Sequence, residues 1–150
     1  MIHPAYAIIA LLTLSACGFF GEFDQQRFSQ ERCVGDATKF ACTERIISLD
    51  PQTGTVGIEL VNGVGETVEI DSVSTNDYSS CGIEKPSFSL IRDGTDVTGQ
   101  PLEANDEFTL RVECEPQPSG KTFDETFTIH FSIIDGISNL QGTIETVVLT

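Results

Sequence analysis

The sequence has few basic residues. Lys and Arg together number eight, against 23 Asp and Glu, and the formal net charge is −15. A surface with this charge repels the phosphate backbone of nucleic acids, and no basic patch offsets the repulsion. We therefore expect no nucleic-acid partner. An acidic, lysine-poor surface also favours solubility in salt-rich surroundings.

Residues that build metal centres and active sites are scarce as well. The two histidines, His3 and His130, are far apart, and no C-x-x-C pair occurs, so no zinc site is predicted. Asp93-Gly94-Thr95-Asp96 has the spacing of the start of a calcium loop but lacks the later carboxylate, which favours a turn. No G-x-S-x-G motif is present, and His130 is expected on the outward face of a strand. We expect no enzyme, no metal and no cofactor.

One long apolar run stands at the start of the chain. Residues 5–20 carry no charge, and Glu22 is the first acidic residue after them. A membrane-spanning helix takes about 20 residues. The apolar part of a secretory signal takes roughly 7 to 15. The run falls between the two lengths, so three interpretations are open.

The first interpretation is a cleaved secretory signal, although no Lys or Arg precedes the run. The second is a lipoprotein signal, because Leu14-Ser15-Ala16-Cys17 resembles a bacterial lipobox, in which the cysteine is acylated. The third is a retained helix that anchors in the membrane and then packs with copies of itself. Its small residues permit close helix contact, and the run continues past Cys17 to Phe23. We favour the third.

The cysteine count is five, and Cys17 belongs to the apolar run. The other four form an even set, which in an exported chain predicts two disulfides in an oxidising compartment. Among the three possible pairings, Cys33–Cys42 with Cys81–Cys114 makes the most local links. Closing the ten-residue segment 33–42 would contribute roughly 3 kcal/mol of stability.

Beyond residue 45 the sequence alternates between apolar and polar residues as β-strands do. The alternation predicts strands at 53–61, 67–75, 87–92, 107–114, 126–134 and 142–149. In the second of these the apolar position slips to Val73, which indicates a bulge or an edge strand. The pattern is typical of an immunoglobulin-like β-sandwich of about seven strands. Tryptophan is absent, so the term describes topology only.

These observations predict a mainly β chain preceded by one long N-terminal hydrophobic α-helix. We expect the helix over residues 1–30, a disulfide-closed neck over 31–45 and a β-sandwich head domain over 46–150.

Several sequence segments together resemble those of archaeal type IV pilin-like proteins, the relatives of archaellins and adhesion pilins. The resemblance covers nearly the whole chain. The segments are Gly18-Phe19-Phe20-Gly21-Glu22-Phe23 after the apolar run, the pair Cys33 and Cys42, residues 58–70, Cys81, residues 102–108 and residues 140–144. The resemblance implies a homopolymeric helical filament at the cell surface, with N-terminal helices in its core and β-domains outside, and with adhesion as one expected role.

In that hypothesis the chain sits in the membrane before assembly. The residues expected to pack the filament core are the large apolar ones of the helix: Ile8, Leu11, Leu12, Leu14, Phe19 and Phe20. The alternative hypothesis is a cell-surface lipoprotein, tethered through Cys17, whose β-sandwich acts as a binding or adhesion module.

Overall fold

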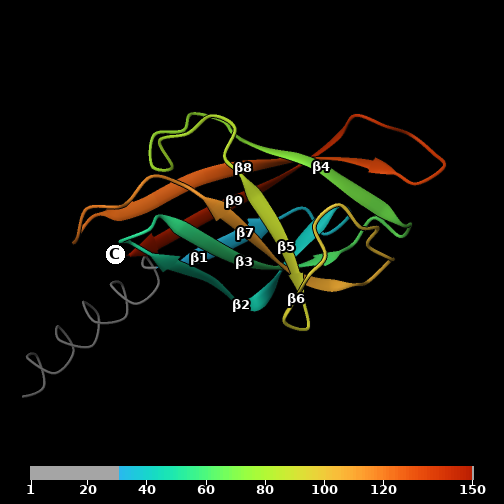
Figure 1. Cartoon of the computed structure of the whole chain (residues 1–150), viewed down its shortest axis with the longest axis horizontal. Coiled ribbons are helices and arrows are strands. Elements are labelled where there is room, and N and C mark those ends of the chain that lie inside the picture. The colour runs from blue at the N-terminus through green and yellow to red at the C-terminus, as the bar shows by residue number, and fades with distance from the viewer. Residues whose placement is uncertain (1–30, 150) are drawn as a thin grey trace, which may run out of the picture. The chain divides into compact units, whose positions relative to one another are not determined.

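The computed structural model describes residues 31–149, which form nine strands in two antiparallel sheets (Figure 1). The strands are β1 (Arg32–Gly35), β2 (Phe40–Asp50), β3 (Thr55–Asn62), β4 (Val68–Thr75), β5 (Phe88–Arg92), β6 (Thr95–Asp96), β7 (Glu107–Glu113), β8 (Thr122–Ile133) and β9 (Leu140–Leu149). The first sheet has the order β1-β9-β8-β4, and the second has the order β2-β3-β7-β5-β6.

Alternating residues of the long strands build the core between the sheets. On β3 and β7, Ile58 lies opposite Leu110 and Val56 opposite Val112, and all four side chains are buried. β8 and β9 contribute Phe127, Ile129, Phe131, Ile144 and Val148 from the other sheet. Burying each large apolar side chain contributes about 1.5 to 3 kcal/mol.

Phe40 joins the two layers. Its ring meets Phe108 of its own sheet edge-on, with centroids 6.1 Å apart, and meets Phe131 of the opposite sheet edge-on at 5.1 Å. Edge-to-face aromatic pairs add about 0.5 to 1.5 kcal/mol to the burial of their area. The first residue of β2 therefore fixes that strand to both layers.

Asn62, fully buried at the end of β3, ties two turns together. Its side-chain amide donates to the carbonyls of Glu66 (3.0 Å), Leu102 (3.2 Å) and Glu103 (3.1 Å), and its oxygen accepts the Val64 N–H. A buried amide with these partners is stabilising, and its loss would leave backbone carbonyls without donors. Asn62 thus stabilises the turn that follows β3 and holds it against residues 102–103.

The predicted fold class needs correction. The described residues contain no helix, and they form nine strands instead of about seven. The predicted helix over residues 1–30 lies outside the described residues. The uncounted strands escaped detection for physical reasons: β6 has only two residues, and β2 is bulged between Cys42 and Ile47, which interrupts its alternation.

The predicted neck over residues 31–45 forms β1 and the first half of β2. β1 pairs with β9, and β2 pairs with β3, so this segment belongs to both sheets. Tertiary packing determines which strands β1 and β2 pair with, and the alternation of residues along the sequence does not indicate these partners. In contrast, the predicted irregularity near Val73 is confirmed, since β4 is an edge strand whose register shifts between Ile70 and Ser72.

Candidate functional site

The most elaborate polar arrangement lies where the connection between β4 and β5, residues 76–87, folds over one end of the sandwich (Figure 1). A disulfide between Cys81 and Cys114 fastens this connection to the end of β7, and both cysteines are buried. Gly82 directly after Cys81 has a φ of +78°, which glycine adopts without strain. The disulfide thus holds a sharp bend against the core.

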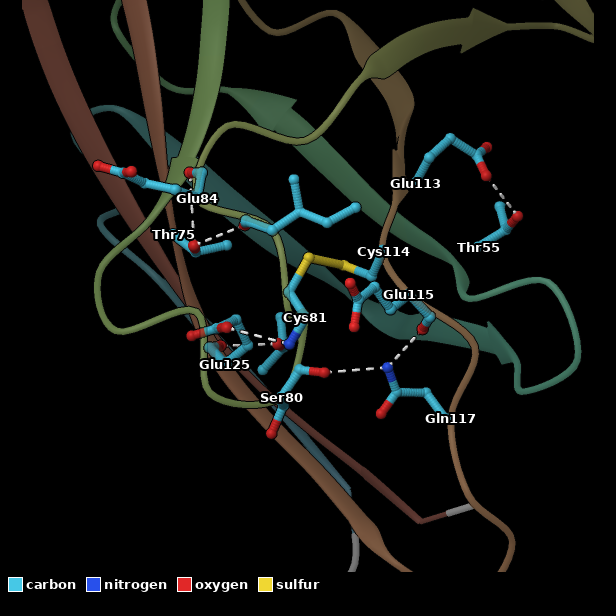
Figure 2. The surroundings of a disulfide bond; sticks show 12 residues. Thr55, Thr75, Ser80, Cys81, Glu84, Glu113, Cys114, Glu115, Gln117 and Glu125 are labelled. Atoms are coloured by element: carbon cyan, nitrogen blue, oxygen red, sulfur yellow. Dashed lines mark hydrogen bonds between the residues drawn. A yellow bond between two sulfur atoms is a disulfide. The ribbon is translucent and has the colours of Figure 1, made fainter.

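Hydrogen bonds from backbone and side-chain donors reinforce the disulfide (Figure 2). The Glu115 N–H donates to the Cys81 carbonyl at 2.9 Å, and the Gln117 side-chain amide donates to the carbonyls of Ser80 (2.9 Å) and Glu115 (2.6 Å). The Thr75 hydroxyl donates to the Ile83 carbonyl at 2.9 Å. The connection is therefore held to β7 on one side and to β4 on the other.

Glu125 is the unusual residue of this region. It occupies an inward position on β8 between Phe123 and Phe127, and its residue is only 2% exposed. One carboxyl oxygen accepts the Cys81 N–H and the other accepts the Thr126 N–H, both at 3.2 Å. Figure 2 shows the carboxyl group directed toward Cys81. A charged residue type thus takes a core position beside a disulfide.

Burial of the Glu125 carboxyl group, followed by hydrogen bonding with Asp77 of the same connection, raises the pKa of Glu125 from 4.5 to about 7. The hydrogen bond with Glu125, followed by the Ser79 N–H, lowers the pKa of Asp77 below its usual range. The environments therefore separate the two carboxyl pKa values, with the proton on Glu125.

Sequence reasoning did not identify this pair, because it began the strand at Thr126. Starting the alternation at Phe123 would have placed Glu125 inward, where an unpaired carboxylate is costly. A glutamate at an inward-facing strand position was therefore the sequence feature that could have pointed to this site. Asp77 carried no comparable signal, since its role depends on how the connection folds.

A second polar pair lies on the outer face of the first sheet. The Ser74 hydroxyl and His130 Nε2 are 2.8 Å apart, and both residues are partly buried. Nucleophilic catalysis needs a third group that orients the histidine. Within residues 31–149 the imidazole makes no hydrogen bond to a carboxylate. The geometry thus describes a cross-strand contact and supplies no complete catalytic arrangement.

The predicted calcium-like loop is the tight turn between β5 and β6. Asp93 and Gly94 both have positive φ, and Asp96 accepts hydrogen bonds from the backbone N–H (2.9 Å) and hydroxyl (2.6 Å) of Thr98. The Asp96 carboxylate is therefore occupied within its own turn. Among the described residues, no three His, Cys, Asp or Glu side chains gather as metal ligands.

The predicted disulfides are both present, Cys33–Cys42 with Cα atoms 5.9 Å apart and Cys81–Cys114 with Cα atoms 4.7 Å apart. The predicted assembly residues Ile8, Leu11, Leu12, Leu14, Phe19 and Phe20, and the alternative lipidation site Cys17, lie outside the described residues. In the part of the chain that is described, no helix is long and apolar enough to cross a membrane.

Comparisons of the chain with protein-family models, with characterised proteins and with solved structures find no match.

Proposed function

We propose that the chain is a non-enzymatic β-sandwich module that is held at a cell surface by a lipid on Cys17. The apolar segment directs export, cleavage before Cys17 leaves this residue at the new N-terminus, and acylation anchors it. The sandwich then faces the outside of the membrane, where it meets partners as a binding or adhesion module.

The pairing of the cysteines carries this proposal. Four of the five form two disulfides with one another, so Cys17 has no cysteine left to pair with inside its own chain. A leftover thiol in an exported protein is prone to oxidation and to pairing between molecules. Cys17 is also the residue that ends the lipobox-like sequence Leu14-Ser15-Ala16-Cys17. Acylation accounts for both facts.

The rest of the molecule is consistent with a surface location. Disulfides persist in oxidising compartments, outside the cytosol. The chain enters the sandwich at β1, where Arg32 lies beside Val147 near the end of β9. The turn that precedes β9 is at the other end of that strand, and it exposes Ile134 (37%) and Ile137 (65%). Contact with a partner is expected at this turn, away from the point of entry.

Intact mass measurement of the full chain extracted from membranes with detergent tests the anchor. We expect a chain that begins at Cys17 and carries the added mass of acyl groups. The variant Cys17→Ser should lose the added mass and leave the membrane fraction. As a control, the double variant Cys33→Ser/Cys42→Ser also loses cysteines, here a disulfide-bonded pair, but should stay acylated. Unmodified Cys17 in membrane-extracted protein would contradict the proposal.

A second candidate function is the pilin-like filament subunit. The observation that favours it is the apolar run itself, which extends beyond Cys17 through Phe19, Phe20 and Phe23. In this case the N-terminal segments pack together at the centre of a homopolymer, each large side chain contributing about 1.5 to 3 kcal/mol on burial. The acidic sandwiches form its outer surface.

The same mass measurement separates the two candidates, because a filament subunit retains residues 5–16. Electron microscopy of material sheared from cells would show filaments, and Leu11→Asp should abolish them while the sandwich stays folded. Filaments that survive Leu11→Asp would exclude a core built from this segment.

A further inference from the structure

The turn between β8 and β9, residues 134–139, exposes two large apolar side chains, Ile134 and Ile137 (Figure 1). A single exposed apolar residue is ordinary on a protein surface. These two, however, line one hollow of about 570 Å³, together with Ile133, which is partly buried and packs against the core. Apolar surface that is gathered at a hollow and bordered by polar residues is typical of a contact site.

Hydrogen bonds fix the shape of this turn. The Ile134 N–H donates to the Thr67 carbonyl at 3.0 Å, and the Ile133 N–H donates to the Ile137 carbonyl at 2.8 Å. Asp135 has a φ of +58°, a conformation that Asp and Asn adopt more readily than other non-glycine residues. A turn fixed in this way presents its isoleucines to a partner at little cost in conformational entropy.

The charged side chains at the hollow are negative. Glu66 and Asp135 line it, both residues are exposed, and no lysine or arginine is among the lining residues. Within residues 31–149 neither carboxylate accepts a hydrogen bond or forms an ion pair. In contrast, Asp36 and Asp96 each accept hydrogen bonds from the threonine two positions later in their own turns. The two carboxylates at the hollow can therefore meet a positive group of another molecule.

These charges discriminate between the possible occupants. A second copy of the chain would bring the same acidic border, and a net charge of −15 opposes its approach. An anionic membrane surface is repelled for the same reason. An uncharged apolar partner would desolvate the carboxylates without compensating them. A basic side chain matches both features of the hollow, because its aliphatic stem packs on apolar surface while its charged end stays beside the carboxylates.

We propose that the hollow receives a basic side chain of a partner protein, an arginine or a lysine that is flanked by apolar residues. Its aliphatic stem lies on Ile134 and Ile137. Its charge lies beside Glu66 and Asp135. Arginine suits the site better, since the guanidinium group has five N–H donors and is more weakly hydrated than an ammonium group. The inference rests on the proposed role of the sandwich as a binding module, but not on the lipid at Cys17.

Titration of the full chain in phosphatidylcholine bilayer discs with a synthetic peptide tests this inference, with NMR of the isoleucine methyl groups as the readout. The peptide Gly-Leu-Arg-Leu-Gly, blocked at both ends, should shift the methyl signals of Ile134 and Ile137. Replacing its arginine by glutamine should weaken binding about threefold or more. Replacing both leucines by serine should weaken it about tenfold. Added salt should weaken binding of the arginine peptide only.

Variants of the chain locate the binding site. Ile137→Ser should weaken binding of the arginine peptide about fivefold or more. Glu66→Gln and Asp135→Asn, the second of which tolerates the positive φ, should each weaken it about two- to fivefold. The matched controls are Val34→Ser, at an exposed apolar residue of β1, and Glu145→Gln, at the exposed carboxylate opposite it on β9. Neither control should change the affinity.

Equal affinity of the wild type and Ile137→Ser, or of the arginine and glutamine peptides, would overturn the inference. Broadening of the Ile137 signal by a spin-labelled lipid, without peptide, would overturn it in favour of the membrane. Shifts that follow the number of chains per disc would overturn it in favour of a second copy. An unacylated chain that binds the peptide would refute only the anchor at Cys17, and an acylated chain that does not bind it would refute only this inference.

Discussion

The two disulfides fasten the sandwich in different ways. Cys33–Cys42 links β1 of one sheet to β2 of the other across a separation of nine residues, and both of its cysteines are partly exposed. Cys81–Cys114 spans 33 residues, and both of its cysteines are buried. The first disulfide closes the short connection between two consecutive strands, while the second joins segments that are distant in the sequence.

Their surroundings differ accordingly. Near Cys33–Cys42 the turn is exposed: Asp36 accepts hydrogen bonds from the N–H and hydroxyl of Thr38, and Lys39 donates to the Gln141 carbonyl. Near Cys81–Cys114 a buried carboxyl group and several side chains hold the connecting segment. The comparison teaches that a local link needs little support from its neighbours, whereas a long-range link is accompanied by polar contacts that position the segment.

Removal of the long-range disulfide should have the largest effect. Chain-entropy arguments give a 33-residue closure about 4 kcal/mol, and two buried alanines would leave a small cavity in addition. We expect Cys81→Ala/Cys114→Ala to lower the free energy of unfolding by about 4 kcal/mol in urea denaturation. If this variant lost less unfolding free energy than the variant without Cys33–Cys42, the long-range disulfide would not be the stronger of the two links.

Removal of the local disulfide should cost less, roughly 3 kcal/mol for a nine-residue separation. Cys33→Ala/Cys42→Ala should also loosen β1, which otherwise pairs only with β9 at the edge of its sheet. Hydrogen exchange should therefore increase in residues 32–35 and remain unchanged in residues 77–82. Equal loss of protection in both regions would show that the two links act on one cooperative unit.

The carboxyl group beside the long-range disulfide makes that region sensitive to pH. Glu125 binds its proton more tightly in the folded protein, with a pKa of about 7 against 4.5, so its contribution is complete below about pH 4.5 and is lost as the pH rises through 7. We expect the wild type to lose about 2 kcal/mol more than Glu125→Gln between pH 5 and pH 8. The difference between their unfolding free energies isolates this group from the other acidic residues.

Sequence periodicity predicted the interior of the long strands. Phe108, Leu110 and Val112 are buried as their alternation indicated, and the pairing of the four cysteines is confirmed. These features are local, since a strand's two faces and the spacing of cysteines can be read along the chain.

What could not be predicted depends on contacts between distant segments. β1 has four residues and acquires its conformation by pairing with β9. Glu125 was missed because the predicted strand began at Thr126, and only the folded connection supplies the Cys81 N–H as its partner. The polar site at the long-range disulfide is thus a property of tertiary structure.

The smallest predicted effect compares single hydrogen bonds in the two regions. Thr75→Val keeps the shape of a buried side chain but removes the donor to the Ile83 carbonyl, and we expect a loss of about 1 kcal/mol. Lys39→Met removes the exposed donor to the Gln141 carbonyl beside the local disulfide and should cost less than about 0.5 kcal/mol, since water replaces it. Both losses would be measured by urea denaturation at one pH. If Lys39→Met cost more than Thr75→Val, the local link would depend on its neighbours as strongly as the long-range one does.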